Sequence, residues 1–306
     1  MRAGGAILLL FLVGLLAACG GGDDAGDEPK AAAPGTLRAL ADAPGEDVAL
    51  VMGTSDYEPG DVRVLFLVVD DRSRAVFSSA GARVWISRGL DEKPIAETTA
   101  TLEQIGVEGS GAAAGDVEQI YAATFRVVEP GKYFLLAEPV DAKPRIQGLA
   151  NVVVEADAKT PSVGEKAYPS RNPTIRDAPA AQISTQSPPS EELLRYTVAE
   201  TLAAKKPFVV AFATPKFCAS RTCGPVVDVL DAVRKDVAAG DALRFIHVEI
   251  YEDNDPKLGT NRWVREWRLP TEPWVFLVGA DGRIAERFEG AVSADELEAA
   301  VRQHLL

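Results

Sequence analysis

One stretch of the chain, residues 206–237, places two cysteines between a buried strand and an amphipathic helix. Its first part, residues 208–212, is an unbroken apolar run, which is too continuous for a strand with one face in solvent and therefore predicts a buried parallel strand. A loop follows, and then Pro225 opens a segment in which valine and leucine recur at helical spacing as far as Val237. Gly240 provides a stop signal. We therefore expect a strand, a cysteine-bearing loop and a helix in succession.

The two cysteines of this loop, Cys218 and Cys223, predict a redox-active dithiol. A thiol at the start of a helix meets unpaired N–H groups and the positive end of the helix dipole, and both favour the thiolate. Cys218 comes first from the strand and Arg221 can support its thiolate, so we predict that Cys218 attacks and that Cys223 resolves. Five residues of regular helix rise about 7.5 Å, so the loop must be irregular for the two sulfurs to bond.

The start of the chain predicts a lipoprotein signal peptide over residues 1–18. Its uncharged run of 14 residues is short for a membrane span and typical of a signal peptide. The ending Leu16-Ala17-Ala18-Cys19 resembles the bacterial lipobox, whose cysteine becomes the lipid-bearing N-terminus. That resemblance implies acylation (palmitate or a similar chain) of Cys19 and a protein anchored on the extracytoplasmic face of the cell membrane. The alternative is an ordinary signal peptide with an incidental cysteine. Residues 19–35 predict a flexible tether.

Cysteine count and charge narrow the function classes. The chain has three cysteines, so lipidation of one leaves a single pair in an oxidising compartment. A cross-link that closes so short a loop constrains the unfolded chain little, which favours a functional pair over a structural staple. The formal net charge of −13 argues against nucleic acid as a partner.

Residues 36–157 predict an all-β, immunoglobulin-like sandwich. Seven short segments read as strands with turn signals between them, and apolar residues alternate clearly in two of them, at 62–68 and 121–127. We find no catalytic or metal-binding pattern here, and the acidic pairs at 70–71 and 91–92 are interpreted as solvated turns. The segment is predicted to be a spacer or docking module.

Residues 158–189 are rich in proline and lack a hydrophobic period, which indicates an extended linker or a strap laid over one of the domains. Residues 190–306 then predict the order helix, strand, helix, strand, helix, strand, strand, helix. Capping-box patterns at Thr197 and Ser293 mark the start of two of these helices.

This order of elements resembles the thioredoxin superfamily, and most closely its extracytoplasmic, membrane-anchored branch. The resemblance covers about the last third of the chain and depends on the dithiol after the first long strand, the run 269–278 before the Asp-Gly turn at 281–282, and Phe288-Glu-Gly290. It implies an α/β thioredoxin-like domain with a cis-proline facing the dithiol. Pro273 is the expected position for that proline, and Pro270 competes with it.

The resemblance also assigns neighbours to the dithiol. The aromatic residue that precedes the first cysteine is kept as Phe217, and Trp274 is expected to line the site. The buried carboxylate of the family falls at Ala211, so that proton acceptor is missing. His247 stands in place of a lysine and is either a proton relay or a strand histidine bonded to the backbone.

Departures from the family pattern leave the register open. Four residues separate the cysteines instead of two, and Cys223-Gly-Pro-Val226 imitates the family motif without its last cysteine. The leading prediction is a lipid-anchored thiol–disulfide oxidoreductase that needs no cofactor or metal and acts on the thiols or disulfides of exported proteins. One alternative is a peroxidase similar to Q-type peroxiredoxins, because of the cysteine spacing and Thr214-Pro215. Others are a Cu(I) carrier using Cys218, Cys223 and His247, and a docking domain without catalysis.

Overall fold

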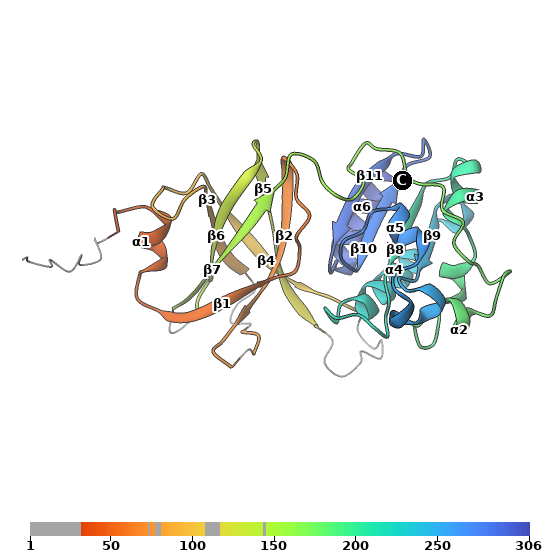
Figure 1. Cartoon of the computed structure of the whole chain (residues 1–306), viewed down its shortest axis with the longest axis horizontal. Coiled ribbons are helices and arrows are strands. Elements are labelled where there is room, and N and C mark those ends of the chain that lie inside the picture. The colour runs from red at the N-terminus through yellow and green to blue at the C-terminus, as the bar shows by residue number, and fades with distance from the viewer. Residues whose placement is uncertain (1–31, 73, 77–80, 108–116, 143–144) are drawn as a thin grey trace, which may run out of the picture.

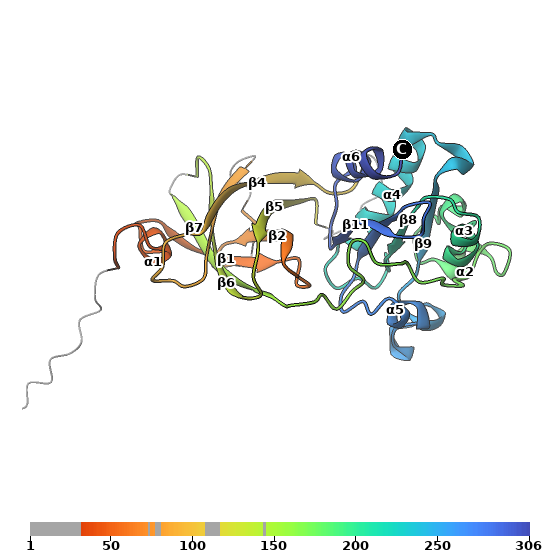
Figure 2. The same ribbon diagram turned by 90° about the horizontal axis from the view of Figure 1, so that it is seen from above.

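The computed structural model describes residues 32–72, 74–76, 81–107, 117–142 and 145–306. It consists of an all-β part and a part built on a second sheet, which lie side by side (Figures 1 and 2). The predicted signal peptide and Cys19 lie outside the described residues. Among the helices of the described ranges, none combines the length and apolar character needed to cross a membrane.

The all-β part is a closed barrel of seven strands in the order β1-β2-β5-β4-β3-β6-β7. All neighbours pair antiparallel except β1 and β7, whose parallel pairing joins residues 46–49 to residues 146–149 and closes the ring. The strands are β1 (Glu46–Met52), β2 (Gly60–Val69), β3 (Gly81–Ser87), β4 (Ala96–Gln104), β5 (Gln119–Val127), β6 (Gly131–Pro139) and β7 (Ile146–Val154). A short helix, α1 (Leu37–Ala41), precedes them.

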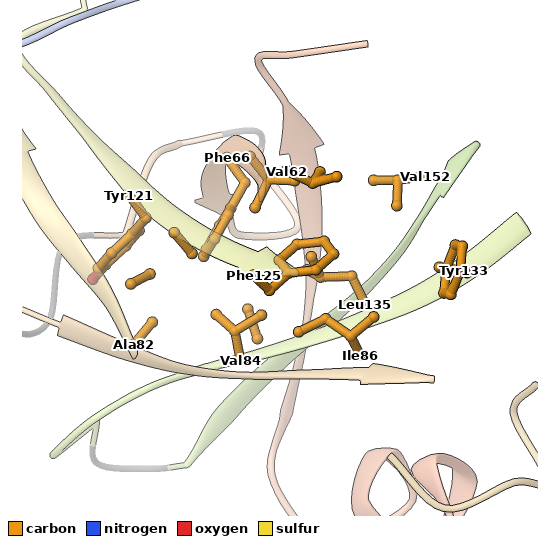
Figure 3. Packing of buried hydrophobic residues seen from close by; sticks show 14 of the residues in the cluster. Val62, Phe66, Ala82, Val84, Ile86, Tyr121, Phe125, Tyr133, Leu135 and Val152 are labelled. Carbon is orange, nitrogen blue, oxygen red and sulfur yellow. The ribbon is translucent and has the colours of Figure 1, made fainter. Parts of the chain in front are cut away.

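The barrel interior is filled by the alternating apolar residues of its strands, which converge in Figure 3. Phe66 and Tyr121 have no exposed surface, and their rings stack with centroids 5.4 Å apart. Since side chains alternate between the two faces of a strand, every second residue of β2 and β5 points into this core.

The prediction of an immunoglobulin-like sandwich is wrong, because the seven strands form one closed sheet instead of two packed sheets. Apolar residues alternate with polar ones along a strand in either architecture. What separates a barrel from a sandwich here is the pairing of β1 with β7 across about a hundred residues, and the local sequence pattern carries no signal for it.

The second sheet has four strands in the order β11-β10-β8-β9, with β8 parallel to β9 and antiparallel to β10. Its strands are β8 (Phe208–Phe212), β9 (Arg244–Val248), β10 (Trp274–Val278) and β11 (Ile284–Glu289). Helices α4 (Cys223–Val237) and α6 (Ala294–His304) pack on one face (Figure 2), and α3 (Val198–Ala203) and α5 (Arg262–Glu266) contribute to the core of the other.

The α/β thioredoxin-like part of the fold prediction is also contradicted, since this sheet is small and carries few helices. Among the helices of the described residues, only α4 and α6 are longer than six residues. The helix expected after residue 190 is divided into a 3₁₀ turn, Glu191–Leu194, and the short α3. The remaining helical pieces are α2 (Ala180–Ile183) and the 3₁₀ turns Gly240–Ala242, Glu252–Asn254 and Pro256–Leu258.

Part of the segment 158–189 packs against α3 and the end of α5. Ser170 accepts hydrogen bonds on its carbonyl from the Ala199 N–H, at 2.9 Å, and on its hydroxyl from the Trp267 indole, also at 2.9 Å. Asn172 accepts one from the Val198 N–H at 2.9 Å. This segment is therefore packed along the second sheet as a strap. The division of the chain into domains at 36–157, 158–189 and 190–306 stays a prediction.

Candidate functional site

The two cysteines lie where β8 ends and α4 begins. Cys218 lies in the turn after the strand, and Cys223 is the first residue of the helix, two residues before Pro225, at which the sequence predicted the segment to open. Both thiols are free and buried, with 7% and 0% of their surface exposed. The connecting turn is irregular, as the spacing required, and Arg221 adopts a left-handed backbone conformation with φ of 60°.

The sulfur of Cys218 caps the N-terminus of α4. It accepts a hydrogen bond from the Cys223 N–H at 3.3 Å. Thr222, the residue at the N-cap position, makes no side-chain capping bond of its own. The first N–H groups of a helix have no partner within the helix and carry its positive dipole end, so an anionic sulfur is well placed to satisfy them.

Two hydroxyl groups extend this network. The Ser220 hydroxyl lies 3.2 Å from the Cys218 sulfur and 2.8 Å from the Thr222 hydroxyl. Each can donate toward its neighbour, and a donor to the sulfur favours the thiolate over the thiol.

The surroundings shift the pKa values of the two thiols in opposite directions. A hydrogen bond from the Cys223 thiol, together with Ser220 and the N–H groups of Thr222 and Cys223, lowers the pKa of Cys218 to about 5 against the opposing effect of burial. Burial, and next the neighbouring Cys218 sulfur, raise the pKa of Cys223. At neutral pH the pair therefore holds one thiolate, on Cys218, and one thiol, on Cys223.

The segment opposite the dithiol contains Glu272 and a cis Glu272–Pro273 peptide bond. The Glu272 carbonyl lies 3.5 Å from the Ser220 hydroxyl. Burial, and then the charge of Cys218, raise the pKa of Glu272. This half-buried carboxylate therefore interacts electrostatically with both thiols, although the sequence offers only an acidic residue between two prolines as a hint.

Phe217 and Arg221 lie in the same loop as Cys218. The Phe217 ring meets the Tyr251 ring edge to face, with centroids 6.3 Å apart. Arg221 is exposed, and the groups that lower the pKa of Cys218 are hydrogen-bond donors and not this guanidinium. The carbonyl of Arg221 accepts a hydrogen bond from the Val117 N–H at 3.3 Å.

His247 and Trp274 are not brought to the sulfurs. The His247 ring lies 3.0 Å from the Ala213 carbonyl and 3.4 Å from the Ser184 hydroxyl, which matches the backbone-bonded alternative for this residue. Trp274 is buried in the core on the sheet face opposite the cysteines, where it stacks on Phe276 at 5.6 Å.

Thr214 contributes a buried hydroxyl to the same region. Among the residues that the structure describes, its side-chain oxygen finds no hydrogen-bond partner. In the described ranges, no group of three or more histidine, cysteine or acidic side chains is arranged to hold a metal ion.

Comparison with known proteins returned structural neighbours only. No family model matches the chain, and no curated protein matches it. A thioredoxin-family thiol:disulfide interchange protein from Chlorobium tepidum aligns with a TM-score of 0.32 and 16% identity, covering 48% of this chain and 97% of its own. A cycloisomaltooligosaccharide glucanotransferase from Paenibacillus sp. aligns with a TM-score of 0.22 and 19% identity, covering 40% of this chain and 16% of its own. Likenesses at these TM-scores carry no argument about activity, which is inferred instead from the contacts of the two cysteines.

Proposed function

We propose that the protein is a thiol–disulfide oxidoreductase, tethered by a lipidated Cys19 to the extracytoplasmic face of the cell membrane. The observation that carries the dithiol chemistry is the 3.3 Å contact between the Cys223 N–H and the Cys218 sulfur. This contact supports a thiolate on Cys218 at a helix start, with a second free thiol on the donating residue. The tether and the location depend on the lipobox-like sequence alone.

The exchange proceeds in two displacements. The Cys218 thiolate attacks one sulfur of a partner disulfide, forms a mixed disulfide and releases the other partner sulfur as a thiolate. Cys223 loses its proton and attacks the Cys218 sulfur, forming the Cys218–Cys223 disulfide and releasing the second partner thiolate. The partner gains two electrons and this protein loses two. The reverse sequence oxidises a partner dithiol, and exported proteins are the substrates in either direction.

Glu272 is the proton acceptor that this exchange requires. Cys223 holds its proton at neutral pH, because its pKa is raised, so the second displacement needs a base. Burial and the Cys218 charge raise the pKa of Glu272 and make its carboxylate a better acceptor. In this role Glu272 replaces the carboxylate that is missing at Ala211.

A peroxidase is the second candidate, and the unpartnered Thr214 hydroxyl favours it. In that reaction the Cys218 thiolate attacks one peroxide oxygen and becomes a sulfenic acid as the other oxygen leaves as water or an alcohol. Cys223 then condenses with the sulfenic acid, forming the disulfide and releasing water. A copper carrier is less well supported, because His247 bonds to a backbone carbonyl and is not gathered with the two sulfurs in a ligand set.

Trapping of mixed disulfides tests the proposal. Cys223→Ser expressed in cells should accumulate exported proteins bound covalently to Cys218, and dithiothreitol should release them. Cys218→Ser in parallel controls for capture by the other thiol. If the purified wild-type dithiol is not oxidised and reduced reversibly, the oxidoreductase assignment fails. Consumption of hydrogen peroxide by the reduced protein would support the peroxidase instead.

A further inference from the structure

One buried carboxylate joins the barrel to the segment that faces the dithiol. Glu289, at the end of β11, is only 8% exposed and accepts four hydrogen bonds. Three come from the loop between β1 and β2 of the barrel: the Ser55 N–H at 2.7 Å, the Ser55 hydroxyl at 2.8 Å and the Asp56 N–H at 2.8 Å. The fourth comes from the Thr271 hydroxyl at 2.8 Å.

Thr271 links Glu289 to the segment that contains the cis-proline. Its hydroxyl oxygen accepts a hydrogen bond from the Trp274 indole N–H at 3.0 Å. Next to Glu289, the Gly290 N–H donates to the Pro273 carbonyl at 2.8 Å. Residues 271–274 are therefore held from two sides by the end of β11, and one of these links leads directly to the barrel.

The barrel also contacts the dithiol loop. The Val117 N–H, just before β5, donates to the Arg221 carbonyl at 3.3 Å. Val107, just after β4, packs against the apolar cluster that contains Cys218 and Cys223. One end of the barrel thus reaches both halves of the site, the dithiol loop and the cis-proline segment.

Ion pairs also join the barrel to the second part of the protein at this boundary. The Arg287 guanidinium lies 3.5 Å from the Asp56 carboxylate and 3.3 Å from the Glu58 carboxylate. Arg63 of β2 pairs with Glu296 at 2.7 Å. These charges are largely withdrawn from solvent, so removal of one partner would leave the other buried and poorly compensated.

From these contacts we propose that the barrel contributes to the redox site and that Glu289 positions residues 271–274 within it. This inference rests on the proposed dithiol exchange. A buried carboxylate that loses its donors is strongly disfavoured, so the barrel loop and the Thr271–Trp274 segment keep a fixed relation. That relation sets where Glu272 lies against Cys218 and Cys223. The function of the barrel is thus to hold a proton acceptor against two sulfurs, in addition to any docking role.

Two conservative variants of the full mature protein test the proposal, one on each side of Glu289. Ser55→Ala removes one donor to Glu289 on the barrel side, at an exposed position where folding is not at risk. Thr271→Val removes the hydroxyl that links Glu289 to Trp274. Thr98→Val, at an exposed hydroxyl of β4 that donates to the Thr124 carbonyl, is the matched control.

The readouts are the indole N–H resonance of Trp274, assigned with Trp274→Phe, and the rate at which Cys223 resolves a mixed disulfide on Cys218. We expect Ser55→Ala to move that resonance, although Ser55 does not contact Trp274, and Thr271→Val to move it further. Resolution should slow about ten-fold in Thr271→Val, the size of one lost hydrogen bond to a charged group. The control should change neither.

An unchanged resonance and an unchanged resolution rate in folded Ser55→Ala and Thr271→Val would overturn the proposal. If Thr271→Val does not fold, Ser55→Ala alone decides it. If the wild-type dithiol proves redox-inert, the exchange function fails, but a shift of the Trp274 resonance in Ser55→Ala still establishes the coupling between barrel and site.

Discussion

The Cys223 N–H donates a hydrogen bond to the Cys218 sulfur over 3.3 Å, so the resolving residue also stabilises the attacking one. Because Cys223 is the first residue of α4, this bond couples the thiolate to a helix start. The Cys223 side chain is also the first cause that lowers the pKa of Cys218. The two cysteines therefore have distinct roles before any partner arrives.

The pH dependence of alkylation should reveal this asymmetry. The pKa of Cys218 is lowered to about 5, so its thiolate predominates above that pH and is lost as the pH falls through it. We expect the rate of iodoacetamide alkylation at Cys218 to be flat at neutral pH and to fall with a midpoint near 5. Cys223→Ala removes the first cause of the shift and should move the midpoint upward, whereas Cys223→Ser, which keeps a donor, should move it less. Mass spectrometry of the quenched reaction measures both.

The reduction potential should follow from the same stabilisation. A thiolate that is favoured in the reduced protein favours reduction of the disulfide. We expect the Cys218–Cys223 couple to be more oxidising than thioredoxin, whose reduction potential is about −270 mV. The wild-type protein is required for this measurement, because Cys223→Ser removes the couple. Equilibration with glutathione redox buffers measures the value. A potential at or below that of thioredoxin would contradict the thiolate assignment.

Replacement of the proposed proton acceptor separates the two chemical steps. In Glu272→Gln, attack by Cys218 on a disulfide should keep its rate, since Cys218 is already a thiolate at neutral pH. Resolution by Cys223 should slow about 10²-fold, the lower range for loss of a general base. Rapid-quench measurement of the mixed disulfide resolves the steps, and Glu252→Gln, at an exposed carboxylate of a nearby loop, is the control. Equal slowing of both steps would indicate a structural effect instead.

The strand, loop and helix around the cysteines could be predicted because they depend on neighbouring residues. The apolar run 208–212 coincides with β8. Thr197 and Ser293 are the N-caps of α3 and α6, and their hydroxyls accept hydrogen bonds from the Glu200 N–H at 2.9 Å and the Glu296 N–H at 3.2 Å. Each of these signals lies within a few positions along the chain.

The fold class and the supporting acidic residues could not be predicted, because they depend on contacts between distant segments. Closure of the barrel needs β1 beside β7, and the Glu289 carboxylate meets Ser55 across 234 residues. An acidic residue at the end of a strand looks like a solvated group until the barrel loop that covers it is known. The prediction of a sandwich failed for the same reason, whereas the α/β prediction failed because the second sheet is small and carries few helices.

Closure of the barrel makes its core a sensitive test of the fold. Phe66 is fully buried and stacked on Tyr121, so Phe66→Ala should lower the free energy of unfolding by about 3–5 kcal/mol through lost burial and the cavity left behind. Val128→Ala, at a side chain that is 80% exposed, should change it by less than about 0.5 kcal/mol. Denaturant unfolding followed by circular dichroism gives both values. A loss below about 1 kcal/mol for Phe66→Ala would contradict a closed, densely packed barrel, because such a core cannot relax around so large a cavity.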